Sequence, residues 1–344
     1  MALNPAEVWE VRTAGSDSNG GAFRSGGTGT DRSQQDTPHV TIDGTTVAAT
    51  VNNATNQITI AGFTVSAADV HNVLQITGGT ATAGFYEITA VDTTNNRWTL
   101  DRSAGTAAQT VQGAMGGALA TISKALGAMV ALNTVWVKNG SYTLSNATLT
   151  PPTNNSSPNV NVVAGYNSTR GDLDDVADWG NFPTITKSAG TEAIWTLSNT
   201  GGQIRNFILD GNGNATHGIN STASASHLDN IRATGCTTFG ILVSSGSTWS
   251  IVRRCRATAN AGSAGGFSLF NSHVSGCRSD GNPGVGFTLT GNVTLTRCIA
   301  DANTSHGFNT TGGQTNLHSC VAYINGGDGF RIGTTTSYTS TCTN

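Results

Sequence analysis

A repeat of roughly 22 residues, beginning near Gly202, constrains this fold more than any other feature of the sequence. One apolar column recurs at spacings of 24, 24, 22, 21, 22 and 22 residues: Phe207, Ile231, Cys255, Cys277, Cys298, Cys320 and Cys342. Another column begins two residues later: Leu209, Ala233, Ala257, Ser279, Ala300 and Ala322. A third precedes them: Ile204, Leu228, Val252, Val274, Leu295 and Leu317. Columns that keep one register over six units predict one structural turn per repeat.

Each unit also contains a second strand, introduced by a glycine and a large apolar residue. These pairs are Gly218-Ile219, Gly240-Ile241, Gly266-Phe267, Gly286-Phe287, Gly307-Phe308 and Gly329-Phe330. An asparagine column follows the first strand: Asn212, Asn260, Asn282, Asn303 and Asn325, with Cys236 in one turn. Short alternating strands separated by Gly, Asn and Thr turns are typical of one turn of a parallel β-helix. The leucine-rich-repeat pattern is absent, so we predict a β-solenoid whose Phe, Ile and Asn side chains stack between turns.

Composition excludes several other classes of protein. Charged residues make up 11% of the chain and the net charge is −3, so no strong field attracts nucleic acid. No apolar run reaches the length of a membrane span, and the start of the chain lacks the pattern of a secretion signal. Six cysteines are too few for a disulfide scaffold. We expect the cysteine column to consist of buried thiols, with disulfides or a metal site as the alternatives.

The N-terminal third departs from the repeat. Residues 117–132, GALATISKALGAMVAL, form the best helix candidate, with Leu119, Ile122, Ala125 and Leu126 on one face. A helix here would cover the open end of the solenoid. Residues 33–115 contain strand-like runs joined by Asn-Asn and Gly-Gly turns, which predict a small antiparallel β insertion. The runs are VTIDGTTVAATV, NQITIAGFTV, VLQITGG, GFYEITAVD and RWTLDR. This insertion either mediates contacts with neighbouring proteins or simply widens the cap.

The segments VWEVRTAGSDSNGG (8–21), GGALATISKAL (116–126) and NTVWVKNGSYTL (133–144) together resemble the start of pectate-lyase-like right-handed parallel β-helix proteins. VAGYNSTRGD (163–172) is similar to the second turn of bacteriophage and bacterial members. The resemblance implies an N-terminal strand and cap segment (1–32), the β insertion (33–115), and a capping helix followed by the β-helix (116–344). It is specific for the fold rather than for an activity, since such folds carry many functions.

Charged residues gather in outward columns beside the cysteines. Arg232, Arg256 and Arg278 follow the column by one position, and Asp280 and Asp301 lie two positions further on. The resemblance to polysaccharide-processing β-helix enzymes implies that such a face can be functional. The two aspartates would then be an acid/base pair or calcium ligands, and the arginines would hold an anionic sugar. Alternatively, the arginines pair with the aspartates and keep an exposed sheet soluble.

Two other features could contact ligands. Trp249 lies in a Ser-Thr-Trp-Ser loop and is a candidate for an exposed aromatic residue that stacks on a sugar. Asp172, Asp174, Asp175 and Asp178 have the carboxylate density of a calcium loop but not its spacing, which favours an ordinary solvated loop. We expect no metal site and no required cofactor. The catalytic motifs of polygalacturonases and pectate lyases are not evident, which favours a protein that is not an enzyme.

The resemblance and the composition together suggest a bacteriophage virion protein of the tail-spike, fibre or decoration type. Its β-helix would contact a host cell-surface polysaccharide or other virion proteins, and we expect a homo-oligomer, with a trimer favoured. The alternatives are a polysaccharide lyase or glycoside hydrolase that uses Asp280 and Asp301, and a bacterial surface adhesin. The sequence ends as another cysteine turn begins, so we expect either that the sequence is truncated or that a partner subunit covers this end.

Overall fold

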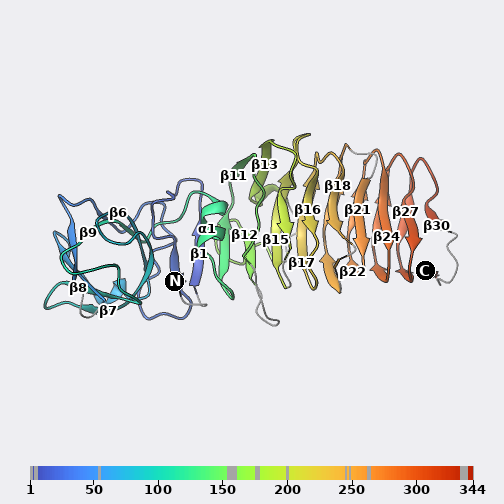
Figure 1. Ribbon diagram of the computed structural model, residues 1–344. Coiled ribbons are helices and arrows are strands. Elements are labelled where there is room, and N and C mark those ends of the chain that lie inside the picture. Colours follow the sequence, from blue (N-terminus) through green and yellow to red (C-terminus); the bar gives the residue numbers. More distant parts are fainter. Residues whose placement is uncertain are drawn as a thin grey trace. The chain divides into compact units, whose positions relative to one another are not determined.

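The computed structural model describes residues 3, 7–52, 56–152, 161–174, 179–198, 201–244, 246–247, 249–261, 265–333 and the backbone of 340–343. The chain forms two compact units, residues 1–138 and residues 139–344. Nearly all regular structure is β (Figure 1). No helix among the described residues is long and apolar enough to cross a membrane.

The first unit contains a closed antiparallel barrel. Its strands are β3 (Val40–Ile42), β4 (Ala48–Asn52), β5 (Gln57–Ala61), β6 (Val73–Gly79), β7 (Gly84–Asp92), β8 (Arg97–Leu100) and β9 (Thr110–Met115), with the short helix η2 (Ala67–Asp69) between β5 and β6. The ring closes because β9 pairs with β4 at its start and with β6 along most of its length. Strand β3 pairs with the end of β9.

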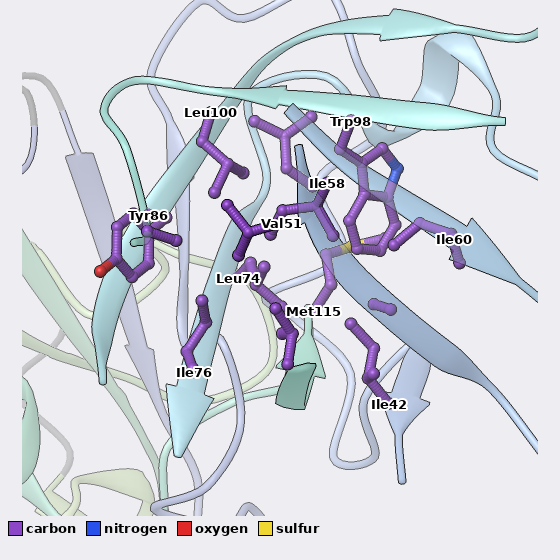
Figure 2. Close-up of a cluster of buried hydrophobic side chains, with 14 of the residues drawn as sticks. Ile42, Val51, Ile58, Ile60, Leu74, Ile76, Tyr86, Trp98, Leu100 and Met115 are labelled. Carbon is purple, nitrogen blue, oxygen red and sulfur yellow. The ribbon is translucent and has the colours of Figure 1, made fainter. Parts of the chain in front are cut away.

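The barrel is filled by the alternate residues of its strands. Ile58 and Trp98, from β5 and β8, are completely buried, and Figure 2 shows them among the other core side chains. The Trp98 indole Nε1 donates to Asp69 Oδ2 at 3.1 Å, which satisfies a polar atom inside the barrel. The run VTIDGTTVAATV forms two strands instead of one, because Asp43 accepts three backbone hydrogen bonds and makes a turn. Strand β9 was not predicted, and whether residues 33–115 form an insertion in a cap stays a prediction.

The remaining elements of the first unit are β1 (Glu7–Val11), β2 (Ala22–Arg24), α1 (Ile122–Ala128) and β10 (Thr134–Lys138). Strand β1 pairs antiparallel with β2 and parallel with β10. The helix is shorter than predicted, since Thr121 caps its start by accepting the Lys124 amide, and Met129 is already extended. Ile122, Ala125 and Leu126 form its buried face, as predicted. Its role as a cap over the solenoid stays a prediction.

The second unit is a β-solenoid whose strands succeed one another in sequence order (Figure 1). It begins with β11 (Ser141–Ser145), β12 (Val162–Tyr166), the short helix η3 (Trp179–Asn181) and β13 (Thr184–Ala189). One sheet consists of β14 (Trp195–Leu197), β16 (His217–Ser221), β18 (Phe239–Val243), β21 (Gly265–Phe270), β24 (Val285–Thr290), β27 (Phe308–Gly312) and β30 (Phe330–Ile332). Every pair in it is parallel.

The other strands of the solenoid carry the cysteine repeat. They are β15 (Gln203–Asp210), β17 (His227–Thr234), β19 (Ser250–Arg253), β20 (Arg256–Thr258), β22 (Ser272–Ser275), β23 (Arg278–Asp280), β25 (Val293–Thr296), β26 (Ile299–Asp301), β28 (Thr315–His318), β29 (Val321–Tyr323) and β31 (Ser340–Thr343). Their parallel pairing places the predicted small and apolar columns in register. The predicted solenoid is therefore confirmed.

Stacked side chains fill the solenoid. The rings of Phe267, Phe287, Phe308 and Phe330 lie face to face, with centroids 4.7, 4.9 and 5.0 Å apart. The asparagine column forms a ladder of amide hydrogen bonds along four turns. The Nδ2 atoms of Asn260, Asn282 and Asn303 each donate to Oδ1 of the next asparagine at 2.9–3.0 Å.

Two members of the predicted columns lie elsewhere. Asn212 is exposed and takes no part in the ladder, because Asp210 caps its backbone amide in a tight turn. Cys342 pairs in register with Leu317 and not with Cys320, so the spacing of 22 residues misplaced it by three positions. The structure leaves Cys236, Cys255, Cys277, Cys298 and Cys320 as free thiols.

Candidate functional site

The candidate site lies on the outer surface of the strands that carry the cysteine repeat. Each turn bends between two short strands at a residue in the left-handed region, whose φ lies between 51° and 64°. These residues are Asn206, Asn230, Arg254, Gly276, Arg297 and Ser319. Because the bend recurs at one position, equivalent side chains of successive turns lie about 4.8 Å apart.

After the bend, β17, β20, β23 and β26 place the predicted charges in two columns. Arg232, Arg256 and Arg278 are paired in register, as are Thr258, Asp280 and Asp301. We call these six residues the arginine face. The sequence therefore placed the charged residues correctly, because register in a solenoid fixes which side chains are neighbours.

Two arginines of this face each bind a carboxylate one turn further along the solenoid. Arg256 donates to both oxygens of Asp280, from Nε at 2.8 Å and from Nη2 at 2.7 Å. Arg278 donates from Nη2 to Asp301 at 2.7 Å and lies 3.5 Å from Asp280. Thr258 also donates to Asp280, at 3.2 Å. The candidate acid/base residues are thus held as carboxylates in ion pairs.

The electrostatics of Asp280 do not suit a general acid. Partial burial opposes its ionisation, but the hydrogen bond from Arg256 and the charges of Arg256 and Arg278 outweigh burial and lower its pKa. A general acid needs the opposite shift, toward the working pH.

Arg232 differs from the other two arginines. Thr258 lies in the next turn, at the position where Arg256 and Arg278 each meet an aspartate. The Nε atoms of Arg232 and Arg278 are both buried without a hydrogen-bond partner among the described residues, but Arg278 also pairs with Asp301 through Nη2. An arginine with an unsatisfied donor at the end of a row of paired arginines can bind a carboxylate, sulfate or phosphate group.

The sequence analysis missed a further ion pair at the bend. Arg254 donates from Nε and Nη2 to Asp229 at 2.9 and 2.7 Å. Arg253 is exposed beside it, and His227 is half-buried one turn before. Burial lowers the pKa of His227, Asp229 opposes this shift, and Arg253, Arg205 and Arg254 add to it. The repeat would have predicted that these residues are neighbours if the sequence columns had included the residue at the bend, whose φ is positive.

Trp249 is exposed, as the sequence analysis proposed. It lies directly before β19, 65% of its surface is accessible, and its ring stacks on His273 at a centroid distance of 5.7 Å. About seven residues separate it from Arg256 along one turn, which is on the order of 20 Å of extended chain. A ligand that contacts both must be extended.

The aspartate-rich loop is a local turn in its described part. Asp172 accepts the backbone amides of Asn167, Ser168 and Thr169 at 2.7–2.9 Å. Asp174 pairs with Arg205 at 3.2 Å. Asp175 and Asp178 lie outside the described residues. Across the described part of the chain, no group of three or more His, Cys, Asp or Glu side chains is arranged to hold a metal ion.

Comparison with known proteins supports the fold. The crystal structure of pectate lyase Pel9A has a TM-score of 0.44 and 16% identity over 60% of this chain, which spans 58% of that enzyme's length. The catalytic domain of a GH87 α-1,3-glucanase has a TM-score of 0.23 and 9% identity over 86% of this chain and 87% of its own. Neither likeness bears on what this chain does. No curated protein matches the sequence. A family model described as a right-handed β-helix region matches residues 193–344, which lie within the solenoid.

Proposed function

We propose that the β-helix is a non-catalytic, rigid surface that binds an acidic glycan along the arginine face. The observation that carries this proposal is the contrast between Arg232, which faces Thr258 instead of an aspartate in the next turn, and Arg256 and Arg278, which pair with aspartates. Trp249 and His273 supply a stacking platform on the same series of strands. Aromatic stacking and arginine–anion bonds are complementary ways to hold an acidic sugar chain.

The test compares an acidic polysaccharide, polygalacturonate, with a neutral glucan of matched length by isothermal titration calorimetry. We expect binding of the acidic chain only, and roughly a tenfold loss in Arg232→Gln, as for removal of one charge-assisted hydrogen bond. The matched control is Arg331→Gln, which removes an exposed arginine from β30 in the other sheet. Equal affinity of R232Q and the unaltered protein would refute the role of Arg232.

The biological setting that we propose is a bacteriophage virion of the tail-spike, fibre or decoration type, in which the protein forms a homo-oligomer, with a trimer favoured. Light scattering of the purified protein tests the oligomeric state. A trimer supports a spike or fibre, whereas a stable monomer favours a decoration protein, an adhesin or a solitary enzyme.

The second candidate function is polysaccharide cleavage by Asp280 and Asp301, with or without calcium. The register that sets these carboxylates side by side favours it, and their ion pairs with Arg256 and Arg278 oppose it. The double variant Asp280→Asn, Asp301→Asn decides between the two proposals. Loss of polysaccharide depolymerisation in the double variant would establish an enzyme, and loss of the unaltered protein's activity on adding EDTA would implicate calcium.

A further inference from the structure

A buried carboxyl group in the first unit has no hydrogen-bond partner among the described residues. Glu7, the first residue of β1, has none of its surface exposed, and neither Oε1 nor Oε2 makes a hydrogen bond. Isolated carboxylates are not stable in such surroundings and take up a proton instead.

The groups around Glu7 leave it without a counter-ion. Arg24 of β2 lies opposite it in register, while Glu87 of β7 and Asp101 after β8 add negative charge. Arg24 Nη1 lies 3.3 Å from Glu87 Oε1, and His71 Nδ1 lies 2.8 Å from the same oxygen.

The remaining cation of the cluster is also engaged. Arg102 lies 2.5 Å from Asp101 and donates to the backbone carbonyl of Phe85. The two arginines and the histidine therefore pair with Glu87 and Asp101. A negative charge on Glu7 would have no cation paired with it.

Glu7 lies where the β1–β2 pair meets the barrel. The Arg24 amide donates to the His71 carbonyl at 3.0 Å, and Phe23 forms a β-bridge with Asn72. Asn72 Nδ2 donates to the Thr30 carbonyl at 2.9 Å. The segment around β2 thus rests on the turn before β6, and Glu87 projects from the neighbouring strand into the same junction.

We infer that Glu7 is a neutral carboxylic acid in the folded protein at neutral pH, and that the junction between the β1–β2 pair and the barrel is a proton-dependent joint that loosens when Glu7 ionises. Burial and then the charge of Glu87 raise the pKa of Glu7 to about 8, with Arg24 opposing and Asp101 adding to the shift. An ordinary glutamate has a pKa of 4.5. Since folding binds this proton, the contribution of Glu7 to stability is full below pH 4.5 and is lost as the pH rises to 8.

The first experiment is an NMR titration of the full chain with ¹³C-labelled glutamate side-chain carboxyl groups. The chain has four glutamates, Glu7, Glu10, Glu87 and Glu192, so few signals must be distinguished. We expect one signal with a midpoint near 8, absent from Glu7→Gln. If every glutamate titrates below pH 6, the inference is wrong. The titration curves are measured on the unaltered protein, and E7Q serves only to assign the signal.

The second experiment measures hydrogen exchange at pH 6 and pH 9, corrected for intrinsic exchange rates. In the unaltered protein, the peptides that cover residues 22–32 and 66–74 should lose protection at pH 9. Glu7→Gln keeps the shape of the side chain without its charge. The same peptides of this variant should be equally protected at pH 6 and at pH 9. Glu192→Gln, in the other unit, should behave like the unaltered protein. Equal loss of protection in E7Q would overturn the proton-dependent joint.

Discussion

Arg256 and Asp280 form a two-fold hydrogen-bonded ion pair across adjacent turns of the β-helix, with Nε and Nη2 at 2.8 and 2.7 Å from the two carboxylate oxygens. The geometry fixes both side chains against the sheet surface. Planar paired bonds of this kind are stronger than single exposed salt bridges. The pair therefore stabilises the stacking of β20 on β23 and leaves Asp280 ionised.

We predict that Asp280→Asn destabilises the protein at pH 7 by about 1 kcal/mol, since both partners are partly exposed. The pKa of Asp280 is lowered from 3.8, so this stabilisation is present above pH 3.8 and is lost as the pH falls further. Urea unfolding at pH 7 and at pH 2.5 measures both effects. The difference between D280N and the unaltered protein should shrink at the lower pH. Asp328→Asn is the control, because the Asp328 side chain is 66% exposed.

The phenylalanine stack provides a second prediction. Phe287 is completely buried between two rings, so Phe287→Ala should destabilise the protein by about 3–5 kcal/mol through lost burial and a cavity. Phe330→Ala removes the same ring from the end of the stack, where it is 40% exposed, and should cost markedly less. Chemical unfolding of the two variants measures the difference. Equal losses would mean that the turns do not share one continuous core.

Register explains how much of this fold could be predicted. In a solenoid, residues one repeat apart become neighbours, so the columns that include Ala233, Ala257 and Ser279 were correct from spacing alone. Spacing failed at Cys342, which pairs with Leu317, because the register of this last turn is offset by three residues from the 22-residue repeat. The barrel lacks such a repeat, and strand β9 was missed because Gly113 stands at a buried position where alternation calls for an apolar side chain.

The chemistry of the site was less predictable than its placement. The repeat predicted that Arg256 and Asp280 lie on the same face. Whether the arginine forms an ion pair with the carboxylate depends on side-chain geometry, which the sequence does not specify. Glu7 was not singled out, since its burial depends on elements more than sixty residues away, including β7. Titratable groups buried by distant segments have no local signal in the sequence.

The buried cysteines give a third prediction. Cys255, Cys277 and Cys298 are at most 1% exposed, and burial raises the pKa of the Cys277 thiol. Because buried sulfur atoms are out of reach of the reagent, these cysteines should not react with Ellman's reagent at pH 8 until the protein unfolds. Cys320 is half-buried and should react first in a Cys342→Ser background. Rapid reaction of four or more thiols in the native state would contradict the packed interior.

The asparagine ladder yields the last prediction, because its members satisfy one another inside the protein. Asn282 Nδ2 donates to Asn303 Oδ1 at 2.9 Å, and Asn282 Oδ1 accepts from Asn260 Nδ2 at 3.0 Å. Asn282→Ala removes both bonds, together with the bond that Asn282 Oδ1 accepts from the Asn260 backbone amide at 3.0 Å. Buried donors of Asn260 then lose their acceptor, so the free energy of unfolding should fall by about 2–4 kcal/mol. Asn212→Ala is the matched control, since Asn212 is exposed and outside the ladder. If both variants lose the same stability, the ladder does not contribute as a unit, and the stacked apolar columns alone hold the turns together.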